Sequence, residues 1–223
     1  MSQSVTLPRG LPRAADASLA FLGLVLFSPL LLLAALAVRL GSSGPALFRQ
    51  ERVGQGGQQF SLLKLRTMRQ ESPGPQITRS GDSRVTPVGR VLRRFKLDEL
   101  PQLWNVVRGD MALVGPRPEV PQYVDQDDPG WQTVLSTRPG LTDPVTLELR
   151  HEEDLLAQVE GDPEEFYIAK LLPFKVKLYV QYLEGRSGWS DVKILFRTAV
   201  SVFLPKTSAN KTWQEIMDLA SDD

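Results

Sequence analysis

The chain has 223 residues, 26 Lys and Arg against 26 Asp and Glu, one histidine and no cysteine. Without cysteine, disulfides, iron–sulfur clusters and thiolate zinc sites are excluded. With His151 as the single histidine, the HExxH zinc motif is also excluded and a Ser-His-Asp triad elsewhere is not expected. The remaining chemistry is that of carboxylates, basic groups and a metal bound through oxygen.

The zero net charge hides two oppositely charged halves. Residues 1–110 carry 15 Lys and Arg against 7 Asp and Glu, whereas residues 111–223 carry 11 against 19. A basic half suits nucleic acid, anionic lipid headgroups or a phosphorylated substrate, and composition does not choose among them.

Residues 17–38 form an uncharged stretch, ASLAFLGLVLFSPLLLLAALAV. As one straight helix it would be about 33 Å long, enough to cross the core of a bilayer. Pro29 interrupts it and predicts a kink, and the Ser28 hydroxyl can bond a carbonyl one turn earlier. Each half is too short to cross alone, so a bent pair of helices would enter one leaflet and return.

Basic residues flank both ends of this stretch. Arg9 and Arg13 precede it, and six Lys and Arg lie between Arg39 and Arg69. Such residues mark cytoplasmic flanks, so both ends are predicted on one side. Because kinks are also tolerated in helices that span, the residues themselves leave the re-entrant and spanning topologies equally open.

Hydrophobic spacing predicts the next elements. Residues 45–68 are predicted as two short strands joined by a turn at Gly54–Gly57, and residues 71–84 as a loop rich in Pro, Gly and Ser. Residues 88–96 are predicted as a basic amphipathic helix. A second helical piece over residues 103–107 ends near glycine 109, and the run after it is a strand or turn ended by prolines.

The second half is predicted to be largely helical. Residues 148–165 are acidic and helix-prone, and four apolar residues are expected on the buried side: Leu149, Leu155, Leu156 and Val159. Residues 170–185 and 189–206 mix aromatic and aliphatic residues with Lys and Arg. A core-facing helix and a helix in a lipid headgroup layer share this pattern, so both interpretations remain.

The stretch FKLDELPQLW contains two adjacent acids, Asp98 and Glu99. In the simplest interpretation Asp98 caps a helix whose first turn contains Pro101. Basic residues precede the acids and Arg117 follows, so the group is also a candidate polyanion site. A carboxylate among arginines is predicted to keep a low pKa, which suits a nucleophile or a ligand of Mg²⁺, the cofactor we expect.

Several stretches together resemble the bacterial sugar transferases, the monotopic phosphoglycosyl transferases that start membrane glycan assembly. In chain order they are the Ser-Pro pair, FRQERVGQGGQQFSLLKLRTMR, TPVGRVLRRFKLDELPQLWNVVRGDMALVGPRP, RPGLT and YVQYLEGRSGWSDVKILFRT. The resemblance covers about residues 13–202. It implies that a phospho-sugar is moved from a UDP-sugar to a polyprenyl phosphate, typically undecaprenyl phosphate, and that UMP is released.

The resemblance also implies roles for individual residues. Asp98 would be the nucleophile that forms a covalent phosphosugar intermediate, and Glu99 would hold Mg²⁺. Basic residues would bind the substrate phosphates: Lys64, Arg93, Arg117 and Arg138.

The fold implied is α+β and mainly helical. Residues 1–40 would be a re-entrant helix–break–helix anchor, broken at Ser28 and Pro29. Residues 41–205 would be the catalytic domain, with a small β-hairpin and amphipathic interfacial helices around a cytosolic active site, and residues 206–223 a tail. The small monotopic protein would lie in the bacterial inner membrane with its catalytic domain on the cytoplasmic face.

The partners expected are a UDP-sugar, polyprenyl phosphate and membrane lipid, with no nucleic acid. The acidic second half is a candidate surface for a downstream glycosyltransferase, and a homodimer is a further candidate assembly. Asp143-Pro144 stands where many family members have Gly-Trp, so the sugar is not predicted. Two other functions are alternatives: a non-catalytic module that binds anionic lipid, and a Mg²⁺-dependent hydrolase of nucleotide sugars or phosphorylated lipids.

Overall fold

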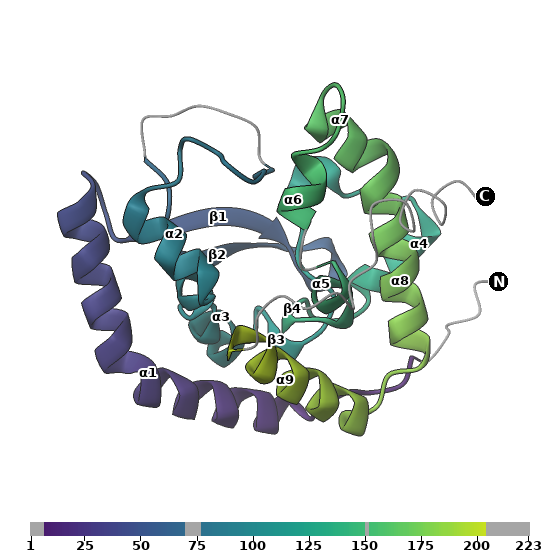
Figure 1. Cartoon of the computed structure of the whole chain (residues 1–223). Coiled ribbons are helices and arrows are strands. Elements are labelled where there is room, and N and C mark those ends of the chain that lie inside the picture. Colours follow the sequence, from purple (N-terminus) through teal and green to yellow (C-terminus); the bar gives the residue numbers. More distant parts are fainter. Residues whose placement is uncertain (1–6, 70–76, 150–151, 204–223) are drawn as a thin grey trace.

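The computed structural model describes residues 7–69, 77–149 and 152–203. Within these ranges the chain is mainly helical, with two small two-stranded sheets. Figure 1 shows a central hairpin, a long bent helix along one edge of the molecule, and a group of later helices on the opposite side of the hairpin. The predicted tail, residues 206–223, and the first six residues of the predicted loop, 71–76, lie outside the described residues.

The central hairpin is formed by β1 (Leu47–Val53) and β2 (Gln59–Leu65), which pair antiparallel over their full lengths. The connection contains a short 3-10 turn, Gln55–Gly57. Gly56 and Gly57 have φ angles of 68° and 74°, a region that glycine enters without the steric cost of a side chain. The glycine-rich stretch is therefore a chain reversal.

Helices α2 (Pro87–Arg94) and α3 (Gln102–Arg108) lie close to the two predicted basic and apolar helical segments. The Thr86 hydroxyl caps α2 by accepting from the backbone N–H of the third helical residue at 2.9 Å. Gly109 ends α3 with a φ of 100°, as a left-handed glycine commonly does at the end of a helix.

A 3-10 turn, Leu97–Glu99, carries the acid pair between α2 and α3. Lys96 precedes the turn with a φ of 56° and is the one described non-glycine residue with a positive φ. The prediction that Asp98 caps a helix is wrong, because Asp98 lies inside this turn and Pro101 flanks the start of α3. The reversal at Lys96 separates the acids from α2 and gives them a turn of their own.

A second sheet was predicted only in part, because the run after glycine 109 was predicted as a strand or turn but its partner strand and their pairing were not, and one helix was not predicted. The strand β3 (Ala112–Val114) pairs in parallel with β4 (Gly140–Thr142), and α4 (Pro129–Leu135) lies in the chain between them. Asp128 caps α4 by accepting from the N–H of Trp131 at 2.8 Å. Strands of three residues contain too few side chains for an alternating pattern to stand out.

The acidic stretch folds into short helices rather than one long one. They are α5 (Pro144–Glu148), α6 (Glu152–Leu156) and α7 (Pro163–Phe166), and α7 runs into a π-helical turn over Tyr167–Leu171. Three of the apolar residues predicted on the inner side are buried, and the fourth is partly buried: Leu149, Leu155, Leu156 and Val159.

The last two described helices differ in exposure. The helix α8 (Leu172–Glu184) is a core helix, and Tyr179 on it is 1% exposed. The helix α9 (Gly188–Phe203) exposes three large apolar side chains: Trp189, Val192 and Phe196. Of the two interpretations that the sequence left open, the core-facing one therefore fits α8, whereas α9 also has an exposed apolar face.

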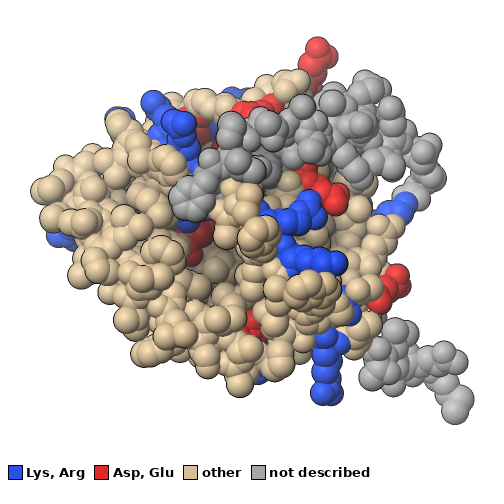
Figure 2. All heavy atoms as spheres, turned by 60° about the horizontal axis from the view of Figure 1, so that its bottom comes forward, with Lys and Arg blue, Asp and Glu red and all other residues tan. Residues whose placement is uncertain are grey.

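The N-terminal stretch forms one helix, α1 (Arg13–Gly41), which contains Pro29. Figure 1 shows that α1 bends part-way along, and the Ser28 hydroxyl donates to the carbonyl of Val25 at 2.8 Å. Among the described residues, α1 is the one helix long and apolar enough to cross a membrane. Figure 2 shows a broad face of the molecule on which uncharged residues predominate.

Large apolar side chains on α1 are exposed rather than packed. They are Leu19, Phe21, Leu22, Val25, Leu26, Phe27, Leu30, Leu32, Leu33, Leu36 and Leu40. Such a surface is unfavourable in water and suits contact with lipid.

Both ends of α1 are bonded to the rest of the molecule. At its start, the Asp16 carboxylate accepts from the backbone N–H of Leu113 at 3.2 Å, and Arg13 donates to a carbonyl of α3 at 2.6 Å. At its end, the Arg66 guanidinium donates to the carbonyl of Ser42 at 2.9 Å. The two ends of α1, on either side of its apolar middle, are thus bonded to the same folded part of the molecule.

Candidate active site

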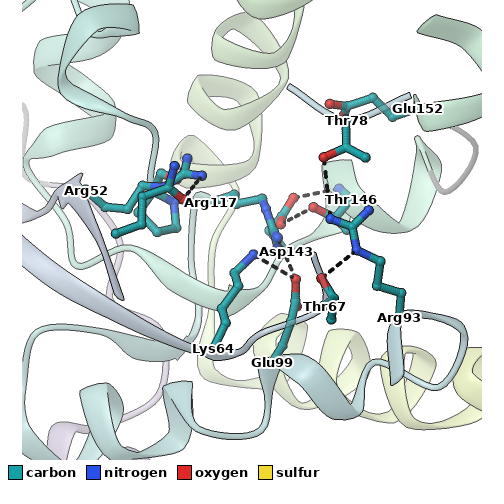
Figure 3. A network of polar contacts seen from close by, with 12 residues as sticks. Arg52, Lys64, Thr67, Thr78, Arg93, Glu99, Arg117, Asp143, Thr146 and Glu152 are labelled. Atoms are coloured by element: carbon teal, nitrogen blue, oxygen red, sulfur yellow. Dashed lines mark hydrogen bonds and ion pairs between the residues drawn. The ribbon is translucent and has the colours of Figure 1, made fainter. Parts of the chain in front are cut away.

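Glu99 lies between two basic side chains that come from other elements. Arg117, in the loop after β3, places Nη2 at 2.6 Å from Glu99 Oε1, and Lys64 on β2 places Nζ at 3.4 Å from the same oxygen (Figure 3). Burial disfavours the charged form of Glu99, but Arg117 and Lys64 outweigh burial and hold the pKa of Glu99 well below its usual range. Glu99 is therefore ionised at neutral pH.

Asp98 is adjacent to Glu99 but has different surroundings. Asp98 is 7% exposed, and its Oδ1 atom is buried without a hydrogen-bond partner among the described residues. Burial, together with the charge of Glu99, raises the pKa of Asp98 although Lys64 opposes this shift. The predicted low pKa is therefore wrong for Asp98 and correct for Glu99, because the nearest cations pair with Glu99.

Because their surroundings differ, the two acids suit different chemical roles. Carboxylates that are poorly stabilised as anions are more basic and more nucleophilic than solvated ones. Asp98 has this character, whereas Glu99 acts as a fixed negative charge that orients two cations. The arrangement supports attack by Asp98 on an electrophile that enters between the acids and the basic residues.

Of the two cations, Lys64 loses its proton more readily than Arg117. Burial lowers the pKa of Lys64 to about 8, even though Glu99 favours its charged form. At neutral pH Lys64 is still mostly protonated. A modest rise in pH removes its charge, which no guanidinium would lose.

Arg93 and Arg138 do not contact the acid pair. Arg93 donates to Thr67 Oγ1 at 3.1 Å and to Thr78 Oγ1 at 3.4 Å, and it pairs with Glu153 at 3.1 Å (Figure 3). Its charge nevertheless favours ionisation of Asp98. Within the part of the chain that the structure describes, no hydrogen bond or ion pair joins the side chain of Arg138 to the acid pair.

Two residues that sequence reasoning missed lie at this site. Arg52 on β1 and Gln102 on α3 line a pocket together with Lys64 and Arg117. Arg52 occurs in the stretch FRQERVGQGGQQF, and Gln102 directly follows the Pro of DELPQ, so both lie in the segments that resemble the family. The family resemblance identified these segments, but only the folded structure shows which of their side chains lie together.

A third missed residue, Asp143, is fully buried near Arg117. Its two oxygens accept from the backbone N–H of Thr146 at 2.7 Å and from the Thr146 hydroxyl at 2.6 Å. Burial raises the pKa of Asp143, and these two hydrogen bonds oppose that rise. Asp143 stands where the sequence departs from the common family pattern, and here it caps α5.

A second group of polar side chains lies next to the site and is called the Lys175 group: Glu119, Tyr167 and Lys175, which are buried, and Glu152, which is partly exposed. Lys175 Nζ is 3.2 Å from Glu152, 3.6 Å from Glu119 and 3.0 Å from the Tyr167 hydroxyl. The Tyr167 hydroxyl in turn donates to Glu119 at 2.6 Å. The other oxygen of Glu119 is 3.3 Å from Arg52, which connects the Lys175 group to the pocket.

The donor set at the acid pair fits Mg²⁺. This ion prefers one or two carboxylates and completes its shell with phosphate oxygens and water. Asp98 Oδ1 has no partner, and the two cations that pair with Glu99 use only its Oε1 atom. No group of three or more acidic or histidine side chains suited to a metal occurs among the described residues, so substrate oxygens would complete the shell.

Several known proteins are similar to this chain in sequence. Residues 8–205 match the family model for bacterial sugar transferases. The UDP-glucose:undecaprenyl-phosphate glucose-1-phosphate transferase of Caulobacter vibrioides is 45% identical over 195 residues, which cover 85% of this chain and 68% of that protein. The UDP-N-acetylgalactosamine-undecaprenyl-phosphate N-acetylgalactosaminephosphotransferase of Aeromonas hydrophila is 39% identical over 194 residues, covering 83% and 42%.

A third relative is closer to this chain in length. The exopolysaccharide production protein ExoY of Rhizobium meliloti is 34% identical over 215 residues, which cover 88% of this chain and 87% of that protein. The chain thus spans less than half of the Aeromonas relative, about two thirds of the Caulobacter relative and most of the Rhizobium relative.

Proposed function

Because the chain belongs to the bacterial sugar transferase family, we propose that it transfers a phospho-sugar from a UDP-sugar to a polyprenyl phosphate and releases UMP. The names of two relatives specify undecaprenyl phosphate as the acceptor, and a third relative is named for exopolysaccharide production. The observation that carries the proposal is the unpaired, buried Asp98 carboxylate beside Glu99 and its two cations.

In the first step an oxygen of ionised Asp98 attacks the phosphorus that bears the sugar. A bond forms between Asp98 and that phosphorus, the bond to the bridging oxygen breaks, and its electron pair leaves with UMP. Lys64 and Arg117 place positive charge where the leaving oxygen becomes negative. When bound by the acid pair, Mg²⁺ supplies further positive charge for the phosphate oxygens.

In the second step an oxygen of the lipid phosphate attacks the same phosphorus. The bond between this phosphorus and Asp98 breaks, the Asp98 carboxylate is restored, and the sugar leaves on a lipid diphosphate. Each step exchanges one phosphate ester or anhydride bond for another, so no oxidant or other co-reactant is needed. This product would be the first lipid-linked intermediate of a bacterial glycan.

The first step can be tested without lipid. Detergent-purified full chain is mixed with Mg²⁺ and either UDP-glucose or UDP-N-acetylgalactosamine, and UMP and intact mass are measured. We expect about one UMP per active site and a sugar-phosphate adduct on the peptide that contains Asp98. Asp98→Asn should form no adduct, whereas Arg108→Gln should behave like the unaltered protein, since Arg108 pairs with Asp110 away from the pocket.

The alternatives give other results in the same experiment. A hydrolase would keep releasing products without lipid, and a module that only binds anionic lipid would release none. Turnover upon addition of polyprenyl phosphate without any adduct would exclude the covalent step. Absence of UMP with either sugar nucleotide, with and without lipid, would contradict the proposed transfer for these two sugars and favour the lipid-binding module.

We also propose that α1 enters one leaflet of the inner membrane and returns to the cytoplasmic face. Contacts at both of its ends support this topology, since Asp16 is bonded to Leu113 and Ser42 to Arg66 of the same body. In a spanning helix these ends would lie on opposite sides of the bilayer.

The topology can be tested with single cysteines, because the chain has none of its own. Arg9→Cys and Ser43→Cys should both react with an impermeant maleimide in inside-out vesicles and neither in intact cells. Labelling of the two positions from opposite sides would contradict the re-entrant topology.

A further inference from the structure

Two amide side chains on α3 are buried but differ in their partners. Asn105 accepts from the backbone N–H of Leu63 at 3.1 Å and donates to the carbonyl of Ser61 at 2.8 Å, so it holds β2 in place. Gln102, nearly one turn earlier, is 2% exposed, and its buried Nε2 atom has no hydrogen-bond partner among the described residues. An unpaired buried donor of this kind is unfavourable for the folded protein. Asn105 thus joins α3 to β2 by hydrogen bonds, whereas no hydrogen bond of this kind is made by Gln102 Nε2 among the described residues.

Gln102 lines a small, partly open pocket beside the acid pair. The pocket is lined by Arg52, Leu62, Lys64, Gln102, Arg117 and Pro118. Three of these residues are basic and none is acidic. A pocket that combines three cations with an unpaired N–H donor is complementary to phosphate oxygens, which accept hydrogen bonds and carry negative charge.

Another unpaired buried atom is Oδ1 of Asp98, four residues before Gln102, and Asp98 interacts electrostatically with Lys64, which lines the pocket. The two atoms have opposite needs, since Gln102 Nε2 requires an acceptor and Asp98 Oδ1 requires a cation or an electrophile. They are not bonded to each other. One phosphate group would meet both needs, because it offers oxygen atoms to Gln102 and an electrophilic phosphorus to Asp98.

We propose that Gln102 Nε2 donates a hydrogen bond to a phosphate oxygen bound in this pocket. Gln102 is then a substrate-binding residue of the transferase, an inference that rests on the proposed function. Phosphate oxygens reach the site from two sources, the diphosphate of the UDP-sugar and the phosphate of the lipid. The pocket recognises the same chemistry in both, and separate measurements of the two steps distinguish them.

The test uses Gln102→Met, which keeps the side-chain length but removes the donor, and Gln102→Glu, which also adds negative charge. The first measurement is the equilibrium affinity for the UDP-sugar that labels the unaltered protein, made in an Asp98→Asn background so that no reaction occurs. The second is the rate at which polyprenyl phosphate discharges a preformed adduct. Arg108→Gln on the same helix is the matched control.

We expect Gln102→Met to weaken nucleotide-sugar affinity, or to slow adduct discharge, by roughly tenfold, the usual effect of one hydrogen bond to a charged group. Gln102→Glu should have a larger effect because it repels phosphate. A loss confined to affinity assigns the hydrogen bond to the UDP-sugar diphosphate. Discharge that needs more polyprenyl phosphate to reach an unchanged maximal rate assigns it to the lipid phosphate, whereas a lower maximal rate alone indicates a role through Asp98 and overturns the inference. Because the affinity is measured without the Asp98 carboxylate, a role of Gln102 that acts only through Asp98 would leave that affinity unchanged.

Thermal unfolding completes the test. Gln102→Met should melt at the same temperature as the unaltered protein or higher, since no hydrogen bond within the protein is lost. Unchanged affinity together with an unchanged discharge rate would overturn the inference, and so would a marked loss of stability, which would reveal a structural partner. If the unaltered protein forms no adduct, the proposed function fails independently of Gln102.

Discussion

The molecule buries two groups of charged side chains that follow opposite rules. In the Lys175 group every carboxylate has a cation and the Tyr167 hydroxyl is bonded on both sides. At the acid pair, Glu99 takes both adjacent cations and Asp98 is left with an unpaired oxygen. Burial of charge is common to both, and incomplete pairing distinguishes the acid pair, which together with Lys64 and Arg117 is called the reactive group because we propose that it carries out the reaction.

The two groups are connected through a short segment. Arg117 pairs with Glu99, and two residues later Glu119 pairs with Lys175 and Arg52. The ion pairs of the Lys175 group therefore hold in place the segment that carries Arg117, a cation of the reactive group. If this comparison is right, substitutions in the reactive group should change catalysis, and substitutions in the Lys175 group should change stability.

The largest expected effect is that of Asp98→Asn on catalysis. Adduct formation and turnover should fall by roughly 10⁴-fold or more, because an amide does not replace a carboxylate nucleophile. UMP release in single-turnover and steady-state assays measures this loss. Retention of more than a few per cent of the activity would mean that Asp98 is not the nucleophile.

The same variant should be more stable than the unaltered protein at neutral pH, by about 1 kcal/mol. Burial and Glu99 raise the pKa of Asp98, so its ionised form costs stability at pH 7. That cost is absent below the unfolded pKa near 4 and is fully present above the folded pKa. Thermal unfolding should therefore show a gap at pH 7 that closes towards pH 4; a less stable variant at pH 7 would indicate that Asp98 has a partner.

Lys175→Met should lower the free energy of unfolding by about 3 kcal/mol, because it removes one of the two cations that pair with buried Glu119 and unpairs Glu152. Chemical denaturation in detergent measures the change. The double variant Lys175→Met with Glu119→Gln should recover part of the loss, since it removes the buried charge that has lost one of its two cations. Equal stability of the single variant and the unaltered protein would show that the Lys175 group is not a scaffold.

Lys64 predicts a pH dependence of catalysis. Burial lowers the pKa of Lys64 to about 8, so the rate of UMP release should fall as the pH rises through about 8. Lys64→Arg should move this fall to higher pH while keeping kcat/KM at pH 7 within about tenfold. A fall at the same pH in both proteins would assign it to another group.

The effect of Lys64 on stability has the opposite sign. Its folded pKa lies below the ordinary value of 10.5, so the unfolded chain binds more protons between these two values. The contribution of Lys64 to stability should therefore rise between about pH 8 and 10 while activity falls, and Lys64→Arg should lack this rise.

Tyr167→Phe should have the smallest effect. Glu119 loses one hydrogen bond but keeps Lys175 and Arg52, so the expected cost is about 1 kcal/mol with little change in adduct formation. Denaturation midpoints and single-turnover rates check both quantities. A large loss of rate at unchanged stability would place Tyr167 within the reactive group.

Local patterns predicted much of the fold. The apolar spacing around α2 and α3, the left-handed Gly109 and the bend of α1 near a proline each depend on neighbours within a few residues. The parallel pairing of β3 with β4 depends on residues far apart in the chain, and three-residue strands contain too short a pattern to reveal it.

The acid pair, too, could be predicted from the sequence only in part. Adjacent acids and nearby arginines were visible in the sequence, but which acid would receive the cations was not. Arg117 reaches Glu99 from the loop after β3, and Lys64 reaches it from β2. The raised pKa of Asp98 follows from this choice, which only the three-dimensional arrangement makes.

The attachment of both ends of α1 to one body has a consequence for where the enzyme works. A spanning helix must match the thickness of the bilayer, and a mismatch costs free energy that sorts proteins between membranes. In the re-entrant topology proposed above, a helix whose start is bonded to Leu113 and whose end is bonded to Arg66 has no second interface to match. The depth of Asp98 relative to the lipid phosphates is then set by the protein, and bilayers with longer or shorter acyl chains should support the same rate.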